Sequence, residues 1–224
     1  MDSPLLTAVA GKYEPMVRQR VRIRFCKQGD LRLIGHRDLM RCFERLFRRA
    51  RLPLGMSEGF HPKPRMTFPS ALALGIEGVD EVLELELTES PPAEELLQRL
   101  KPHAPPGLGL KSAEVLPEGA KKARVRSFSY QVPIPGRRRV GLAEKIDHLM
   151  AASSCPIRRP DRRTTVDLRP LLEELSVEEG VLRMRLRAGS GASAGPWDVL
   201  AALGLSDLRI EGVRLRRTTV EIQS

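Results

Sequence analysis

The stretch of residues 57–68, SEGFHPKPRMTF, brings together three side chains that can hold a negatively charged group: His61, Lys63 and Arg65. A proline follows His61 and another follows Lys63, and proline fixes its own φ angle and biases the preceding residue toward extended backbone. Such a segment has little conformational entropy left to lose on binding. We therefore interpret residues 57–65, called the hook loop below, as a rigid loop that displays cations to an anionic ligand. A structural turn with a solvated cationic edge is the alternative.

His36 is the second residue suited to chemistry, because it stands at the start of a predicted helix beside Arg37 and Asp38. An imidazole acts as a general acid or base near neutral pH, and it can contact a phosphate together with free helix N–H groups. A histidine that only caps the helix is the alternative. His36 and His61 are thus candidate acid and base for a metal-independent enzyme that processes or modifies RNA.

Known catalytic and metal-binding signatures are missing from the sequence. It contains no G-x-x-x-x-G-K-[ST], H-E-x-x-H or G-x-S-x-G motif. Cys26, Cys42 and Cys155 have no metal-like spacing and fit a reducing cytoplasm. We expect no cofactor and no metal ion. The first residues lack the features of a secretion signal, and no apolar run is long enough to span a membrane. These observations predict a cytoplasmic protein.

The net charge of +10 is concentrated in one part of the chain. Residues 17–66 contain 14 lysines or arginines and 4 acidic residues. Uneven positive charge of this kind is typical of a surface that binds a polyanion such as RNA, although an arginine-rich composition alone is the simpler explanation.

Part of this charge falls on a predicted helix, HRDLMRCFERLFRRARL, whose apolar residues recur at helical spacing. Arg37, Arg41 and Arg45 repeat every four residues on another face of it. Like charges at this spacing repel each other by a few tenths of a kcal/mol per pair, and an anionic partner would relieve that repulsion. We interpret these arginines as nucleic-acid-binding candidates, with a solvated helix face as the alternative.

The order of the elements predicts an α+β fold. Residues 18–26 and 82–87 alternate apolar and charged side chains, as half-buried strands do. After a flexible tail, 1–16, the segment 17–116 has the order β-α-β-β-α-β of a ferredoxin-like unit. A linker, 117–124, then precedes a second segment of similar order, 125–224. In this second half the strands are expected at 125–134, 162–170, 180–188 and 207–222. We therefore predict two ferredoxin-like halves with mainly antiparallel sheets.

The alternating strands should direct their arginines away from the helices, onto the open face of the sheet. In the first half, Glu84 and Glu86 are expected to pair with Arg22 and Arg24 across neighbouring strands. The second half shows no obvious acidic partner strand, so its arginines are the stronger candidates for nucleic-acid binding. They are Arg183, Arg185, Arg187, Arg214 and Arg216.

A longer pattern resembles a known family. The chain contains KQGDLR, HRDLMR, RRARLPL, SEGFHPKPR and a strand DEVLELEL, in this order over residues 27–87. Together these resemble the radical-SAM-linked domain of unknown function, which bacteria fuse to or encode beside cobalamin-binding radical S-adenosylmethionine (SAM) enzymes. The family often has serine where this chain has Gly35, so any contact by that hydroxyl is absent here. The resemblance implies a radical SAM partner, and it implies no established reaction.

The chain cannot itself hold the cluster of a radical SAM enzyme, because the superfamily motif C-x-x-x-C-x-x-C is absent. The hypothesis we favour is an accessory module that presents RNA, such as tRNA or rRNA, to the partner enzyme. The alternatives are the RNA enzyme described above and a protein–protein adapter that docks its partner through the acidic segment 77–95.

Overall fold

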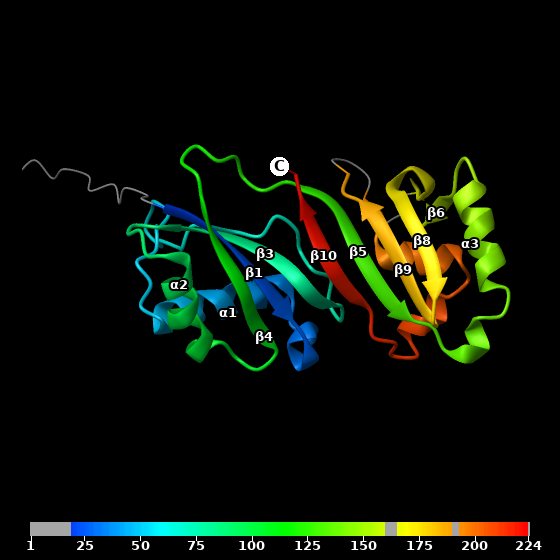
Figure 1. Ribbon diagram of the computed structural model, residues 1–224, viewed down its shortest axis with the longest axis horizontal. Coiled ribbons are helices and arrows are strands. Elements are labelled where there is room, and N and C mark those ends of the chain that lie inside the picture. Colours follow the sequence, from blue (N-terminus) through cyan, green and yellow to red (C-terminus); the bar gives the residue numbers. More distant parts are fainter. Residues whose placement is uncertain (1–18, 160–164, 190–192, 224) are drawn as a thin grey trace, which may run out of the picture.

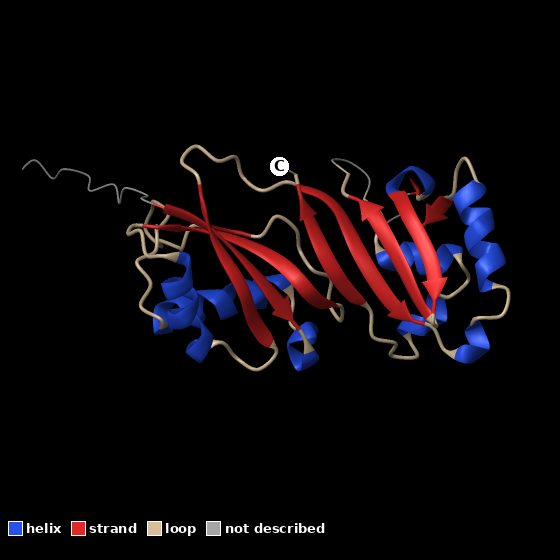
Figure 2. Cartoon of the chain, viewed as in Figure 1, coloured by secondary structure: helices blue, strands red, loops and turns tan. Residues whose placement is uncertain are grey.

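The computed structural model describes residues 19–159, 165–189 and 193–223. They form one long sheet with the strand order β4-β1-β3-β10-β5-β9-β8, and β2 pairs with β3 off this path. Nearly all neighbouring strands are antiparallel, and helices lie on one face of the sheet (Figures 1 and 2). The predicted α+β class with mainly antiparallel pairing is confirmed.

In the first half, the strands are β1 (Gln19–Lys27), β2 (Met66–Thr67), β3 (Glu77–Leu87) and β4 (Leu108–Leu116). Its helices are α1 (His36–Arg49) and α2 (Ala93–Leu100), with 3-10 turns η1 (Gly29–Leu33) and η2 (Lys101–His103). β1 lies between β4 and β3 and is antiparallel to both, while β2 pairs with the far edge of β3. This is the β-α-β-β-α-β arrangement.

The alternation of β1 explains how this half packs. Val21, Ile23 and Phe25 are at most 1% exposed and contact the apolar face of α1, including Phe43 and Phe47. The intervening arginines therefore point to the opposite face, because successive side chains of a strand alternate between its two faces.

The second half contains β5 (Val125–Pro133), β6 (Pro156–Arg158), β7 (Thr165–Asp167), β8 (Leu172–Glu178), β9 (Val181–Arg187) and β10 (Arg216–Ile222). Its helices are α3 (Leu142–Ala151) and α4 (Pro196–Ala202), with 3-10 turns η3 (Gly136–Arg138), η5 (Arg169–Leu171) and η6 (Ser206–Arg209). Within the main sheet the order β10-β5-β9-β8 repeats that of the first half.

One predicted strand was misplaced. The segment 162–170 lies partly outside the described residues, and its described part contains β7, which pairs only with β6 in a separate two-stranded sheet. The strand that completes the main sheet is β8, ten residues further along. The expected strand 207–222 is also shorter, since it begins with the 3-10 turn η6 and becomes a strand only at Arg216.

The two halves join through a short parallel contact in which Arg216 and Arg217 of β10 face Glu77 and Gly78 of β3. The sheet therefore runs through both halves without interruption (Figure 1). Each half keeps its own apolar core, and Leu72 and Ile76 from the first half pack into the core of the second.

Candidate functional site

The arginines of β1 are engaged in ion pairs. Arg20 and Arg22 share the carboxylate of Glu84 at 3.0 and 2.9 Å, and Arg24 lies 2.8 Å from Asp80. The expected pairing of Arg22 with Glu84 is present. The expected pairing of Arg24 with Glu86 is wrong, because the register places Val82 opposite Arg24 and Glu86 opposite Arg20.

The linker also covers this part of the sheet. Arg20 donates a hydrogen bond to the carbonyl oxygen of Ala120, and the backbone N–H of Ala123 donates to Glu84 at 3.2 Å. Glu84 is consequently only 4% exposed. The first half therefore does not present an open arginine face.

The expectation that the second-half arginines lack acidic partners is wrong. Their partners come from β8, β10 and, for Arg216, β3, and β8 was not recognised as a strand in the sequence. The pairs are Arg183–Glu178 at 3.7 Å, Arg185 with Glu173 at 3.3 Å, Glu174 at 3.4 Å and Glu221, Arg187–Glu173 at 3.0 Å, and Arg216–Glu77 at 3.0 Å.

Glu221 of β10 binds Arg185 in one of these pairs. Hydrogen bonds from Ser127 and Arg185 lower the pKa of the Glu221 carboxyl below its ordinary value. Arg214 differs from its neighbours, since it is exposed and forms no ion pair within the described part of the chain. The open sheet face is thus largely neutralised.

The acidic segment 77–95 is also partly internal. Glu77, Glu81 and Glu84 are 3–4% exposed and bind arginines within the chain. These three glutamates are therefore not available to dock a partner.

The arginines of α1 differ from those of the sheet in how they are paired. Arg37, Arg41 and Arg45 are exposed, as are Arg48 and Arg49 in the last turn. Only Arg41 has an ion-pair partner among the described residues, and that contact with Asp38 measures 3.5 Å between two side chains that are more than half exposed. Such a pair contributes little, so the outer face of α1 keeps its positive charge.

The hook loop is closed at its base by backbone pairing. Met56 and Pro64 form a β-bridge, the N–H of Ser57 donates to the Lys63 carbonyl oxygen at 2.8 Å, and the Lys63 N–H donates to the Ser57 hydroxyl at 3.0 Å. His61 and Lys63 are exposed beyond this closure. Arg65 is partly neutralised by Glu86 at 3.5 Å and Glu58 at 3.9 Å.

The tip of the hook loop also carries Phe60, whose side chain is fully exposed. Sequence analysis did not single out this residue, since a phenylalanine in a predicted loop is more often buried. An exposed ring next to cations is suited to stacking on a nucleic-acid base.

The two candidate catalytic histidines have different surroundings. His36 packs edge-on against Phe68 with ring centroids 5.3 Å apart, and Phe68 in turn contacts the aromatic rings of the first core. His61 lies at the exposed tip of the hook loop. No hydrogen bond joins these two described residues, so the geometry gives no support to an acid–base pair.

The exposed basic residues of the first half are concentrated in α1 and the segment that follows it through the hook loop. The chain leaves the end of α1 and enters the hook loop at the outer end of the molecule, while the start of α1 lies toward the middle (Figure 1). We define the helix–hook surface as Arg37, Arg41, Arg45, Arg48, Arg49, Arg51, His61 and Lys63.

The predicted site residues do not form one surface. The hook loop is anchored to Glu86 at one end of β3, while β10 joins at Gly78 near the other end. Eight residues of strand separate these points, or about 26 Å. The helix–hook surface is therefore separate from Arg183, Arg185 and Arg187.

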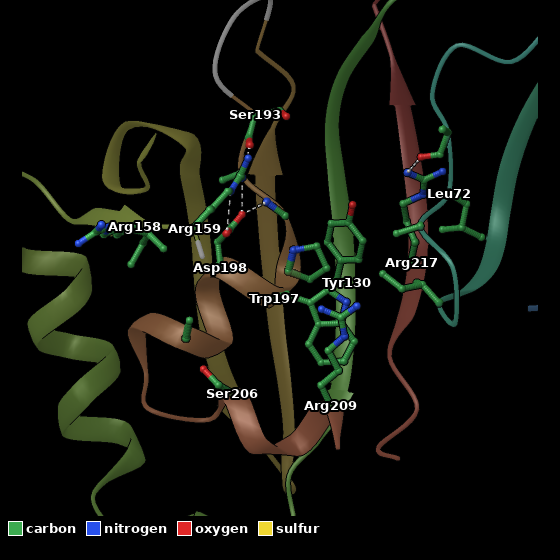
Figure 3. A pocket seen from close by; sticks show the side chains of 18 residues that line it. Leu72, Tyr130, Arg158, Arg159, Ser193, Trp197, Asp198, Ser206, Arg209 and Arg217 are labelled. Carbon is green, nitrogen blue, oxygen red and sulfur yellow. Dashed lines mark hydrogen bonds and ion pairs between the residues drawn. The ribbon is translucent and has the colours of Figure 1, made fainter. Parts of the chain in front are cut away.

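A central groove, not foreseen from the sequence, lies where the halves meet. It encloses about 840 Å³, with Tyr130 and Arg217 on its floor, Leu72 and Ile76 on one wall, and α4 and η6 on the other (Figure 3). Its volume is within the usual range for a small-molecule site, and such sites often lie between domains.

Arginine dominates the polar lining of this groove. Arg159 binds Asp198 at 2.6 Å, and Arg217 binds Glu81, so these two are neutralised within the protein. Arg209 lies over the Trp197 ring at 5.5 Å, and Arg158 is exposed with no ion pair among the described residues. The groove therefore keeps a net positive charge.

The described residues include no cluster of three or more histidine, cysteine or acidic side chains able to hold a metal ion. Within the same residues, no helix has the length and apolarity needed to cross a membrane.

These features define an α+β protein made of two ferredoxin-like units in one sheet, with a cationic helix edge and an arginine-lined central groove. The chain belongs to the family described as "Uncharacterized protein conserved in bacteria (DUF2344)", whose model matches residues 20–196. None of the curated proteins compared with the chain matches it.

A solved structure, the crystal structure of an unknown protein from Galdieria sulphuraria, is similar over 92% of this chain and 99% of its own. The two share 13% sequence identity and align with a TM-score of 0.27.

Proposed function

We propose that this protein is an accessory module that binds RNA along the helix–hook surface and presents it to a radical SAM enzyme. The observation that carries the proposal is the contrast between two sets of arginines. Those of the sheet are matched to carboxylates, whereas those of α1 stand exposed with one weak partner among the described residues. Protein surfaces that bind nucleic-acid phosphates keep such cations available.

The spacing on α1 suits a polyanion. Arg37, Arg41 and Arg45 follow one another at about 6 Å along the helix axis, and Arg49 extends the row by another turn. Their mutual repulsion costs the free protein a few tenths of a kcal/mol per pair, and phosphates would remove that cost. At the outer end of the row, Lys63 and the exposed ring of Phe60 add a phosphate contact and a stacking surface.

The salt dependence of RNA binding tests this proposal. We would measure the affinity for a labelled single-stranded RNA of about 16 nucleotides at several salt concentrations by fluorescence anisotropy. The variant Arg37→Gln/Arg41→Gln/Arg45→Gln should bind more weakly. The slope of log K against log salt should fall by about 2, because each lost phosphate contact on a single strand removes about 0.7.

The matched control is Arg183→Gln/Arg185→Gln/Arg187→Gln. It removes the same net charge from arginines that are already paired, so its slope should equal that of the wild-type protein. Equal losses in both variants would show that net charge alone drives binding, and the helix–hook surface would then be rejected.

The radical SAM partner is the second component of the proposal. It is supported by the resemblance of residues 27–87 to the radical-SAM-linked domain. The dispersed cysteines also agree with a separate cluster-bearing protein, since Cys42 is buried and Cys26 and Cys155 are half-buried at distant places in the fold.

Co-elution would test the partner. The protein would be co-expressed with the cobalamin-type radical SAM protein encoded nearest to it and separated by size-exclusion chromatography. A stable complex that still binds the RNA probe supports presentation. Separate elution at all salt concentrations, with RNA binding intact, would leave an RNA-binding module without this partner.

A further inference from the structure

We propose that the central groove binds a single nucleotide, with its base beside Trp197 and Tyr130 and its phosphate at Arg209. The nucleotide is either free or part of the RNA that lies along α1; the second case rests on the proposed function and extends it.

The groove offers an aromatic surface for a base. Trp197 is half-buried and packs against the second core, which fixes its ring, and Arg209 lies across it at 5.5 Å (Figure 3). Tyr130 lines the same groove. Burial raises the pKa of the Tyr130 phenol, so it is protonated at neutral pH and can donate a hydrogen bond. Leu72 and Ile76 close the opposite wall with apolar surface.

The groove also offers charge for a phosphate. The Nε and one terminal nitrogen of Arg159 bind Asp198, and the latter nitrogen also bonds the Ser193 carbonyl oxygen. Arg217 is similarly occupied by Glu81 and the carbonyl oxygen of Ala71. These two arginines shape the walls. Arg209 is exposed and has no carboxylate partner among the described residues. Arg158 is also exposed, but its side chain points away from Trp197 and Arg209, on the far side of the Arg159–Asp198 pair (Figure 3).

A nucleotide fits this combination better than other anions. An acidic peptide would satisfy the arginines without using the indole ring, and inorganic phosphate would leave the apolar wall and the ring uncovered. A nucleotide joins a flat base, which stacks on an aromatic or guanidinium surface, to a charged phosphate that arginine recognises.

The groove is connected to the helix–hook surface. The N–H of Gly75, in the wall loop 71–76, donates to the carbonyl oxygen of Arg32 in η1 at 2.9 Å. η1 leads directly into α1, so the wall loop 71–76 contacts the segment that precedes the start of α1. An RNA strand following α1 from the hook loop would reach the groove with one of its nucleotides.

The protein provides its own reporter for a test, because Trp197 is the only tryptophan in the chain. Titration with AMP, GMP, CMP and UMP should change its fluorescence in a saturable way. The matching nucleosides and inorganic phosphate should each bind at least tenfold more weakly. Equilibrium dialysis of radiolabelled AMP would measure the same affinity independently of the fluorophore.

The variant Arg209→Gln changes one exposed residue and should still fold, and it should weaken nucleotide binding at least tenfold. Arg187→Gln removes the same charge outside the groove and should leave the affinity unchanged. Equal affinity of the groove variant and the wild-type protein would overturn the inference. Displacement of AMP by a glutamate-rich peptide at similar concentration would also overturn it, in favour of a peptide site.

The RNA probe separates the two sources of the nucleotide and the two proposals. If the groove variant weakens binding of both AMP and RNA, the nucleotide belongs to the RNA; if it weakens only AMP binding, the ligand is a free nucleotide. If the α1 variant loses RNA binding while the groove variant binds AMP with wild-type affinity, only the groove proposal is rejected. If the α1 variant binds RNA normally while the groove variant no longer binds AMP, only the helix–hook surface is rejected.

Discussion

Arg217 of β10 forms a bidentate ion pair with Glu81 of β3, and both side chains are less than 5% exposed. The pair lies where the two halves meet, and the guanidinium also stacks over Phe128 at 4.9 Å. Its residues are 136 positions apart in the chain. This contact fixes how β10 enters the sheet and hence the shape of the groove floor.

Removal of one partner of this pair should be costly. We expect Glu81→Gln to lower the free energy of unfolding by about 3–5 kcal/mol, because a buried guanidinium would lose its counter-charge. Urea denaturation would measure the change. Glu178→Gln breaks the exposed pair with Arg183 and should cost less than about 1 kcal/mol. Similar losses in the two variants would show that the buried pair has no special role.

The stability should also depend on pH through Lys27. This side chain is 1% exposed and donates to the Ile34 carbonyl oxygen at 2.8 Å. Burial lowers the pKa of its ammonium below the ordinary 10.5, and the nearby Glu81 opposes that change. Between the lowered pKa and 10.5 the unfolded chain binds the proton more strongly, so this lysine makes the free energy of unfolding rise with pH.

Lys27→Met removes that contribution. The stability of the wild-type protein relative to this variant should therefore increase as the pH rises from about 7 toward 10, as measured by urea denaturation at each pH. A difference that stays constant, or that moves the other way, would contradict the lowered pKa.

Replacement of Gly107 by a residue with a side chain should destabilise the fold. It has φ = +85°, its carbonyl oxygen accepts the N–H of Gln28 at 2.8 Å, and a methyl group on it would overlap the Gln28 carbonyl oxygen. Gly107→Ala should therefore lower the free energy of unfolding by more than about 1 kcal/mol. Gly136→Ala, where a methyl group would meet only open space, should change it by less than about 0.5 kcal/mol. Thermal unfolding of both variants would compare them.

The hook loop should become more mobile when the Ser57 hydroxyl, which accepts a hydrogen bond from the Lys63 N–H, is removed. Ser57→Ala leaves the Lys63 N–H without its acceptor, so hydrogen exchange at that amide should accelerate while global stability changes by less than about 0.5 kcal/mol. Ser153→Ala, at an exposed position, is the control. Unchanged exchange at Lys63 would mean that the prolines alone hold the loop.

Local patterns in the sequence were sufficient for much of the fold. The period of two in β1 and β3, and the helical period of α1, each depend on residues close together in the chain. β8 was missed because a bulge between Leu172 and Glu174 interrupts its alternation, while the Thr- and Val-containing segment before it looked more strand-like. That single error removed the acidic neighbours of β9 from the predicted surface.

The groove could not be predicted in the same way. Leu72, Tyr130, Arg158, Trp197 and Arg217 come from five separated segments. The fold of the second half gathers the last four, and the parallel contact of β3 with β10 joins the half that carries Leu72 to them. The exposed arginines of α1 were recognisable, because their availability depends on helical spacing and on few neighbours.

The short β3–β10 contact has a consequence for biosynthesis. Among the described strands, β10 is translated last. One edge of the beginning of β3 therefore stays unpaired until more than a hundred further residues have been synthesised. That edge carries the carboxylates Glu77 and Glu81, and charge directed inward on an open strand discourages association with another nascent chain. We therefore expect the glutamates that later bind arginine to discourage association of the unfinished sheet with other chains.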